Sequence, residues 1–330
     1  MANGSKSPAL SFRILHSEFR IVVSCAMDRI LGLKIDVCTC EGLRVGVPNL
    51  LRLLGRHGVR ASFFVALGPD TSGRAILRAL RPGFLAKMRR TSAIRTYGLR
   101  TIFSGTLLPP RHMSRFADTL REVVAEGHEL AVHGYDHRLW QDRLHRMTKQ
   151  AIREEIDRAI VIYRQVAGQA PRGFGAPGWQ ASAVSLEVLD EVGFGYASDT
   201  RGLQPFFPRV GERRLRTLQL PTTFPTLDEV LGPDDPGGDN FVDHVRGGIR
   251  ERIWSVLTIH AEMEGVGFQA IAERLLATLR QDGVTCHPLE NMAGETRARA
   301  GEKIPVAEVV ARPIRGRAGT VAMPAGLEVG

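Results

Sequence analysis

The stretch Leu130-Ala-Val-His-Gly-Tyr-Asp-His137 is the most informative part of this chain. An apolar, strand-like run leads into it, and the spacing His133-x-x-x-His137 allows two imidazoles to bind one metal ion. A divalent metal ion indicates hydrolytic chemistry. The stretch therefore predicts a strand that ends at a metal site.

Two other short apolar runs also end in a residue that can take part in catalysis. One is Leu33-Lys-Ile-Asp36, which ends in an acid, and the other is Val256-Leu-Thr-Ile-His260, which ends in a histidine. Strands that each deliver a polar residue at their carboxyl end are typical of an α/β barrel active site. We therefore expect Asp36, His133 and His260 to lie close together.

Apolar strands and amphipathic helices alternate from residue 33 to residue 286, and glycines follow several of the helices. Alternation of this kind predicts parallel strands joined by crossover helices. About seven or eight such units favour a barrel over an open sheet. The expected strands are 33–37, 61–67, 129–133, 172–176, 195–197, 217–220, 255–260 and 284–286. The expected helices are 47–57, 114–126, 149–166, 183–192 and 270–280.

The bulk composition is that of an ordinary globular protein, with 330 residues, 43% of them hydrophobic and 24% charged. No apolar stretch reaches the roughly 18–20 residues that a membrane span needs. The four cysteines (Cys25, Cys38, Cys40 and Cys286) are too few for a disulfide framework, so we expect a reducing compartment. One alternative use of Cys38 and Cys40 is a structural zinc site with the two histidines.

The two ends of the chain differ from the middle. Residues 1–30 show no clear periodicity and are interpreted as an N-terminal extension, with Met27 as an alternative start. Residues 294–330 are rich in Ala, Gly, Arg and Val, with three interrupting prolines. This composition predicts a weakly ordered tail.

The net charge of +9 is concentrated in one block. Between Thr71 and Ala117 there is no acidic residue, and the block contains ten basic ones, among them Arg89 and Arg90. Apolar residues are interleaved with them, a combination that suits an anionic membrane surface or a lipid phosphate. The alternatives are nucleic acid, for which no recognised motif is present, and a solvated face of ordinary helices.

Several motifs occur in an order that is far more specific than any one of them. They are 68–73 (GPDTSG), 133–140 (HGYDHRLW), 178–179 (GW), 198–202 (SDTRG), 221–230 (PTTFPTLDEV) and 258–265 (TIHAEMEG). On these the chain resembles the polysaccharide deacetylase superfamily, with its NodB-homology domain. Within it, the likeness is greatest to the 4-deoxy-4-formamido-L-arabinose-phosphoundecaprenol deformylases. The resemblance implies a distorted (β/α)7-type barrel over residues 31–293, with the basic block at about 71–117 as an insertion.

The resemblance also implies roles for individual residues. Asp36 corresponds to the general base, His260 to the general acid, and His133 with His137 to metal ligands. Asp199 matches a polar position that orients the general-acid histidine, here His260. Alternatively, Asp199 pairs with Arg201. Residues implied to contact substrate or membrane are Arg89, Arg90, Trp179, Arg201 and Glu262. For Glu262 and Glu264 the alternative is a surface position.

Two positions depart from the pattern of the superfamily. Its members have Asp-x-Asp at the first strand, whereas this chain has Asp36-Val-Cys38. We expect Cys38 to be the third ligand; the alternative is that the third ligand has been lost at this position. A thiolate ligand favours zinc, with cobalt or manganese as alternatives. The superfamily also has an arginine where this chain has Gln180. Loss of that cation predicts a raised pKa for Asp36 unless Arg172 or Arg201 compensates.

The resulting hypothesis is an enzyme, a metal-dependent deformylase acting on amino-arabinose carried by undecaprenyl phosphate in the modification of lipid A. We expect it in the cytoplasm, peripherally on the inner face of the cell membrane, and without a nucleic-acid partner. One alternative is a deacetylase of another polyprenyl-phosphate-linked N-acetyl sugar. Another is a catalytically impaired relative that binds the lipid-linked sugar.

Overall fold

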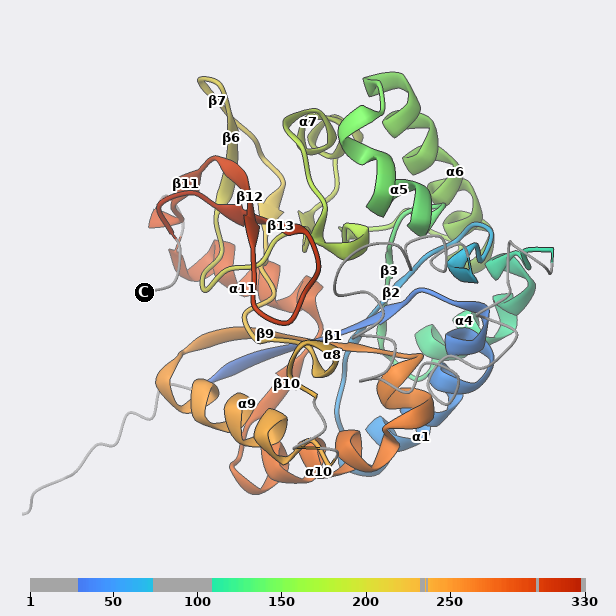
Figure 1. Ribbon diagram of the computed structural model, residues 1–330, viewed down its shortest axis with the longest axis vertical. Coiled ribbons are helices and arrows are strands. Elements are labelled where there is room, and N and C mark those ends of the chain that lie inside the picture. Colours follow the sequence, from blue (N-terminus) through green and yellow to red (C-terminus); the bar gives the residue numbers. More distant parts are fainter. Residues whose placement is uncertain (1–28, 74–108, 232–234, 236, 301–302, 328–330) are drawn as a thin grey trace, which may run out of the picture.

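The computed structural model describes residues 29–73, 109–231, 235, 237–300 and 303–327. Within these ranges a curved sheet of parallel strands is surrounded on its outer side by helices (Figure 1). Residues 1–28 of the expected N-terminal extension and most of the basic block, with Arg89 and Arg90, lie outside the described residues. The part of the chain that is described contains no helix long and apolar enough to cross a membrane.

The main sheet has eight strands in the order β10-β1-β2-β3-β4-β5-β8, and β9 also pairs with β1. All these pairings are parallel. Each strand coincides with one predicted from the sequence. Their bounds are β1 Ile30–Val37, β2 Ser62–Val65, β3 Glu129–Val132, β4 Gly173–Phe174, β5 Tyr196–Ala197, β8 Leu218–Gln219, β9 Trp254–His260 and β10 Thr285–His287.

The sheet curves round until its two ends meet. The backbone N–H of Thr223, just after β8, donates to the carbonyl of Val256 in β9 over 2.9 Å. The backbone N–H of Val256 donates in return to Thr223 Oγ1 over 3.0 Å, and the hydroxyls of Thr222 and Thr258 lie 2.8 Å apart. These few bonds take the place of a full strand pairing, so the barrel is distorted rather than regular. The predicted α/β barrel class is confirmed.

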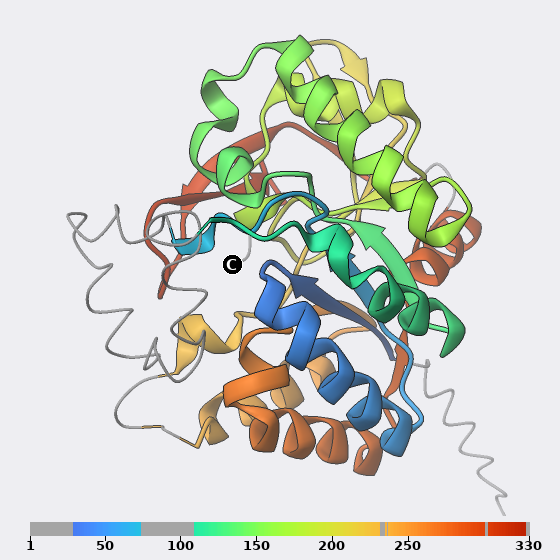
Figure 2. The ribbon, with the colours of Figure 1, turned by 90° about the vertical axis from the view of Figure 1, so that its right-hand side faces the viewer.

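The helices form a row around the outside of the sheet (Figure 2). Gly58, Gly168 and Gly193 follow three of them in the left-handed conformation, as the sequence predicts. The bounds are α1 Val47–His57, α4 Ala117–Ala125, α6 Lys149–Ala167, α7 Ala183–Val192, α9 Asp239–Glu251 and α10 Gln269–Gln281. Shorter helices are η1 Gly42–Gly46, η3 Met113–Phe116, α5 His137–Arg143, η4 Leu144–Arg146, η5 Pro177–Trp179, α8 Leu227–Val230 and η6 Met263–Gly267.

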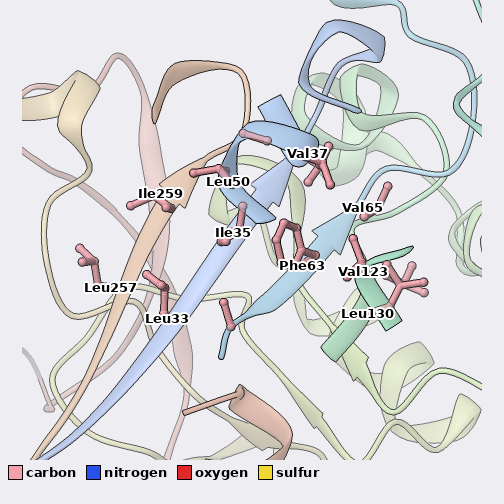
Figure 3. Close-up of a cluster of buried hydrophobic side chains, with 14 of the residues drawn as sticks. Leu33, Ile35, Val37, Leu50, Phe63, Val65, Val123, Leu130, Leu257 and Ile259 are labelled. Carbon is pink, nitrogen blue, oxygen red and sulfur yellow. The ribbon is translucent and has the colours of Figure 1, made fainter. Parts of the chain in front are cut away.

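Strand β1 shows how the fold separates core from site. Leu33, Ile35 and Val37 are fully buried and belong to the apolar cluster between the sheet and the helices (Figure 3). Because side chains alternate along a strand, Lys34 and Asp36 point to the opposite face, inside the barrel. One face of β1 therefore contributes to the apolar core, and the other face places Lys34 and Asp36 inside the barrel.

The prediction of a weakly ordered tail from residue 294 is wrong for most of that segment. Helix α11 spans Leu289–Ala300, β11 (Val306–Ala307) pairs with β6 (Phe207–Val210), and β12 (Val309–Pro313) forms a hairpin with β13 (Thr320–Pro324). The remaining strand, β7 (Arg213–Arg214), pairs with β6. Composition misleads here because Val321 is buried against the rest of the molecule, which stabilises a segment with little apolar surface of its own.

Candidate active site

Asp36 and His260 lie directly opposite one another on neighbouring strands. They are register partners of β1 and β9, near the carboxyl ends of both strands. Asp36 is only 3% exposed. Since partners in a parallel pair share a face, both side chains project into the mouth of the barrel. The structure thus brings together the predicted general base and general acid.

A buried lysine that the sequence analysis missed lies beneath Asp36. Lys34 is fully buried, and its Nζ lies 3.3 Å from Asp36 Oδ1 and donates to the Ser198 carbonyl over 3.2 Å. Burial raises the pKa of Asp36, but the charges of Lys34, His133 and His260 outweigh it and hold that pKa below its usual value.

The predicted rise in the pKa of Asp36 is therefore wrong, and neither arginine considered as compensation provides the cation. Arg172 pairs with Glu290 on the surface, and Arg201 pairs with Glu229. The position of Lys34, two residues before Asp36 in a buried strand, is a signal in the sequence that could have identified it.

Cys38, His133 and His137 form a cluster that could hold a metal ion. One potential ligand atom from each residue lies within 4.8 Å of the other two. His133 directly follows β3, and His137 opens α5. Between them Gly134 has φ 78°, a left-handed conformation that favours glycine and turns the chain back toward the barrel. The fold thus brings together the three residues that the sequence analysis expects as ligands.

The protonation of His133 suits metal binding. Its Nδ1–H donates to the Gly175 carbonyl over 2.7 Å, so the lone pair for a metal ion is the one on Nε2. Burial lowers the pKa of His133 to about 4, so the imidazole is neutral at neutral pH. A neutral, oriented imidazole whose second nitrogen is hydrogen-bonded is the usual form of a histidine ligand.

Cys38 supplies a sulfur in place of the expected oxygen. Its backbone N–H donates to Glu262 Oε2 over 3.4 Å. Burial and the neighbouring Glu262 raise the pKa of the thiol well above its usual value, so ionisation requires a cation close to the sulfur. Two imidazoles and one thiolate are a donor set that zinc accepts. Cys40 lies elsewhere, with its sulfur 3.6 Å from Met113 Sδ, and does not join this cluster.

Trp179 forms one wall of the site. Its ring lies edge-on to His260, with 6.4 Å between centroids, and its Nε1–H donates to Thr222 Oγ1 over 3.0 Å. The guanidinium carbon of Arg201 lies 4.9 Å from the Trp179 ring centroid, while its nitrogens donate to Glu229 and to the Phe224 carbonyl. Trp179 thus lies beside His260, and Arg201 lies against Trp179.

Asp199 is placed differently from the expectation. Its carboxylate accepts from the backbone N–H of Ala176 and from the Gln219 amide, both over 2.8 Å. Burial raises the pKa of Asp199 to about 6. In the described residues no hydrogen bond joins Asp199 to His260 or to Arg201, so its observed contacts order the strand ends around the site.

The two glutamates after His260 are buried, so the alternative of surface charges is wrong. Glu262 is 4% exposed and lies beside Cys38, and burial raises its pKa. Glu264 is fully buried and accepts from the backbone N–H of His260 over 2.9 Å. Burial raises the pKa of Glu264 to about 7. Glu264 thus holds the backbone at the end of β9.

Comparisons with known proteins agree with this geometry. The polysaccharide deacetylase family profile matches residues 26–197. The chain is 35% identical over 260 residues to a probable 4-deoxy-4-formamido-L-arabinose-phosphoundecaprenol deformylase of Shewanella sediminis, covering 78% of this chain and 84% of that protein. It is 30% identical over 285 residues to the probable enzyme of the same name from Wigglesworthia glossinidia brevipalpis, covering 85% and 97%.

The fold is also found in a crystal structure of a probable polysaccharide deacetylase from Pseudomonas aeruginosa PAO1. The TM-score is 0.57 at 19% identity, over 83% of this chain and 93% of that one. Deformylases and deacetylases both break an amide bond between an acyl group and nitrogen. The chain belongs to the polysaccharide deacetylase family and is an amide hydrolase.

Proposed function

We propose that this protein is a metal-dependent deformylase that removes the N-formyl group from 4-deoxy-4-formamido-L-arabinose carried on undecaprenyl phosphate, a step in the modification of lipid A with aminoarabinose. The observation that supports it most is the joint placement of Asp36, His260 and the Cys38–His133–His137 cluster at the mouth of the barrel. The substrate is proposed from the two deformylases that align over most of the chain.

The residues divide the reaction between them. A divalent cation held by Cys38, His133 and His137 would polarise the formamide carbonyl and make a water molecule more acidic. Asp36, kept ionised by Lys34, accepts a proton from the attacking water. His260 donates a proton to the leaving nitrogen as the carbon–nitrogen bond breaks. The products are formate and the free 4-amino sugar on its lipid carrier.

The test is mass spectrometry of formamido-arabinose polyprenyl phosphate incubated with the zinc-loaded protein. We expect loss of the formyl group with the parent protein and at least about 100-fold less with His133→Ala, because that change removes a ligand. No loss at full metal occupancy would point instead to another polyprenyl-linked acyl sugar, such as an N-acetyl sugar. No loss and no bound metal would favour a protein that only binds the lipid-linked sugar.

We also propose that the basic block holds the protein at the cytoplasmic face of an anionic membrane. Ten basic residues and no acidic ones between residues 71 and 117 support this. Each basic side chain near such a surface contributes about 1 kcal/mol. Reversing Arg89 and Arg90 to glutamate is therefore expected to weaken binding to anionic liposomes by more than about tenfold.

The matched control for the liposome assay reverses two basic residues on α6, outside the basic block. Arg153 and Arg158 are 45% and 59% exposed, and changing both to glutamate alters the net charge equally. Sedimentation with phosphatidylserine vesicles measures both variants. Equal binding by the Arg89/Arg90 variant and the parent protein would exclude the proposed membrane role.

A further inference from the structure

The C-terminal hairpin of β12 and β13 is attached to two loops of the active site. The backbone N–H of Arg201 donates to the Ala322 carbonyl over 2.8 Å, and the Gln180 amide donates to the Thr320 carbonyl over 2.7 Å. Gln180 directly follows Trp179, and Arg201 lies two residues after Asp199. The hairpin therefore packs against the segments that carry Trp179 and Arg201, more than a hundred residues away in sequence.

The turn of the hairpin fits closely against helix α8. Gly316 has φ 82°, and a Cβ at this position would collide with the carbonyl oxygen of Glu229. A side chain would therefore be strained by its backbone conformation and would also push the turn away from α8. Because the turn approaches α8 so closely, the next residue, Arg317, lies against Trp179 and Glu229.

Arg317 makes three contacts there. Its Nη1 lies 3.4 Å from Glu229 Oε1, its Nη2 donates to the Gly178 carbonyl over 3.4 Å, and its guanidinium carbon lies 4.7 Å from the Trp179 ring centroid. Arg201 also pairs with Glu229 and lies over the same indole. A buried carboxylate thus holds two guanidinium groups against one aromatic ring, an arrangement that cation–π attraction favours.

Trp179 is in a conformation that its surroundings must maintain. Its φ of 53° is the one positive value among the described residues other than glycine. A bulky side chain in this region is strained and persists only where neighbouring contacts hold it. Trp179 is 2% exposed, and its indole lies edge-on to His260. A change in the orientation of the indole would therefore alter the position of the His260 imidazole.

We propose that Arg317 is a positioning residue, which holds Trp179, and through it His260, in the orientation needed for proton donation to the leaving nitrogen. The C-terminal hairpin is then a component of the active site. The role of His260 as acid belongs to the function proposed above, whereas the hold of Arg317 on Trp179 does not depend on it.

The test compares Arg317→Ala with Arg315→Ala, an exposed arginine of the same hairpin. We expect Arg317→Ala to lower kcat by about tenfold with KM within about twofold, because a small misplacement of a catalytic group slows chemistry more than binding. Arg315→Ala should match the parent protein. Arg317→Lys should recover only part of the loss, since lysine keeps the charge but not the planar group.

A second readout does not depend on activity. Acrylamide quenching of the Trp179 fluorescence, obtained by difference from a Trp179→Phe variant, should increase in Arg317→Ala and not in Arg315→Ala. Unchanged kcat and quenching in Arg317→Ala would overturn the proposal, as would a raised KM at unchanged kcat. If the parent protein itself does not deformylate the sugar, the proposed function fails, and the quenching comparison still decides whether Arg317 holds Trp179.

Discussion

Replacement of Asp36 by asparagine is expected to lower kcat by about 10²–10⁴-fold, the range that a positioned general base contributes. Asparagine keeps the size of the side chain but cannot accept the proton of the attacking water. The measurement is the rate of formate release from the formamido sugar. Activity within twofold of the parent protein would remove Asp36 from the mechanism.

The same change disturbs a buried ion pair, so stability must be measured beside activity. Lys34 is fully buried, and leaving its ammonium without a carboxylate costs up to about 3–5 kcal/mol of unfolding free energy. Asp190→Asn is a suitable control, because Asp190 is 4% exposed, pairs with Arg213 and belongs to α7. We expect that variant to lose stability while it retains activity, which separates loss of the base from partial unfolding.

Replacement of Cys38 by alanine is expected to weaken zinc binding by more than about 100-fold, since loss of even an outer partner of a ligand costs 10–100-fold. Cys38→Asp should instead keep a bound metal and shift the preference from zinc toward manganese, because a carboxylate is a harder ligand than a thiolate. Competition between the two metals, followed by elemental analysis after dialysis, measures both effects.

Cys40→Ala is the matched control for the metal experiment. Cys40 is buried two residues further along, and its sulfur lies against Met113, outside the ligand cluster. Its removal should leave zinc stoichiometry unchanged. If Cys38→Ala retained zinc as tightly as Cys40→Ala, the sulfur of Cys38 would not be a ligand, and two histidines with water would account for the site.

Much of the fold could be predicted from local patterns in the sequence. The alternation of Leu33, Ile35 and Val37 with Lys34 and Asp36 identifies a strand with one apolar face, and glycines mark where helices end. Asp36 and His260 occur at the ends of such strands. Because parallel strands of a barrel end at the same rim, the meeting of Asp36 and His260 could be predicted from the sequence.

The long-range contacts could not be predicted in this way. The spacing of Lys34 and Asp36 places both side chains on one face of β1, but only the curvature of the sheet buries the two together, and this burial beside Lys34 sets the pKa of Asp36. Glu264 looks like a surface charge, but it is fully buried behind His260. In both cases tertiary packing decides the solvation of a charge, which local composition does not reveal.

The C-terminal hairpin illustrates the same division most clearly. By itself the sequence determined the parallel strands, the helix ends and the types of residue that meet at the barrel mouth, because these depend on periodicity and chain direction. Only the tertiary structure decided that the tail is ordered and that Arg317 lies over Trp179. Such contacts join segments far apart in the chain, and their stability comes from surface buried between those segments rather than from any property of either one alone.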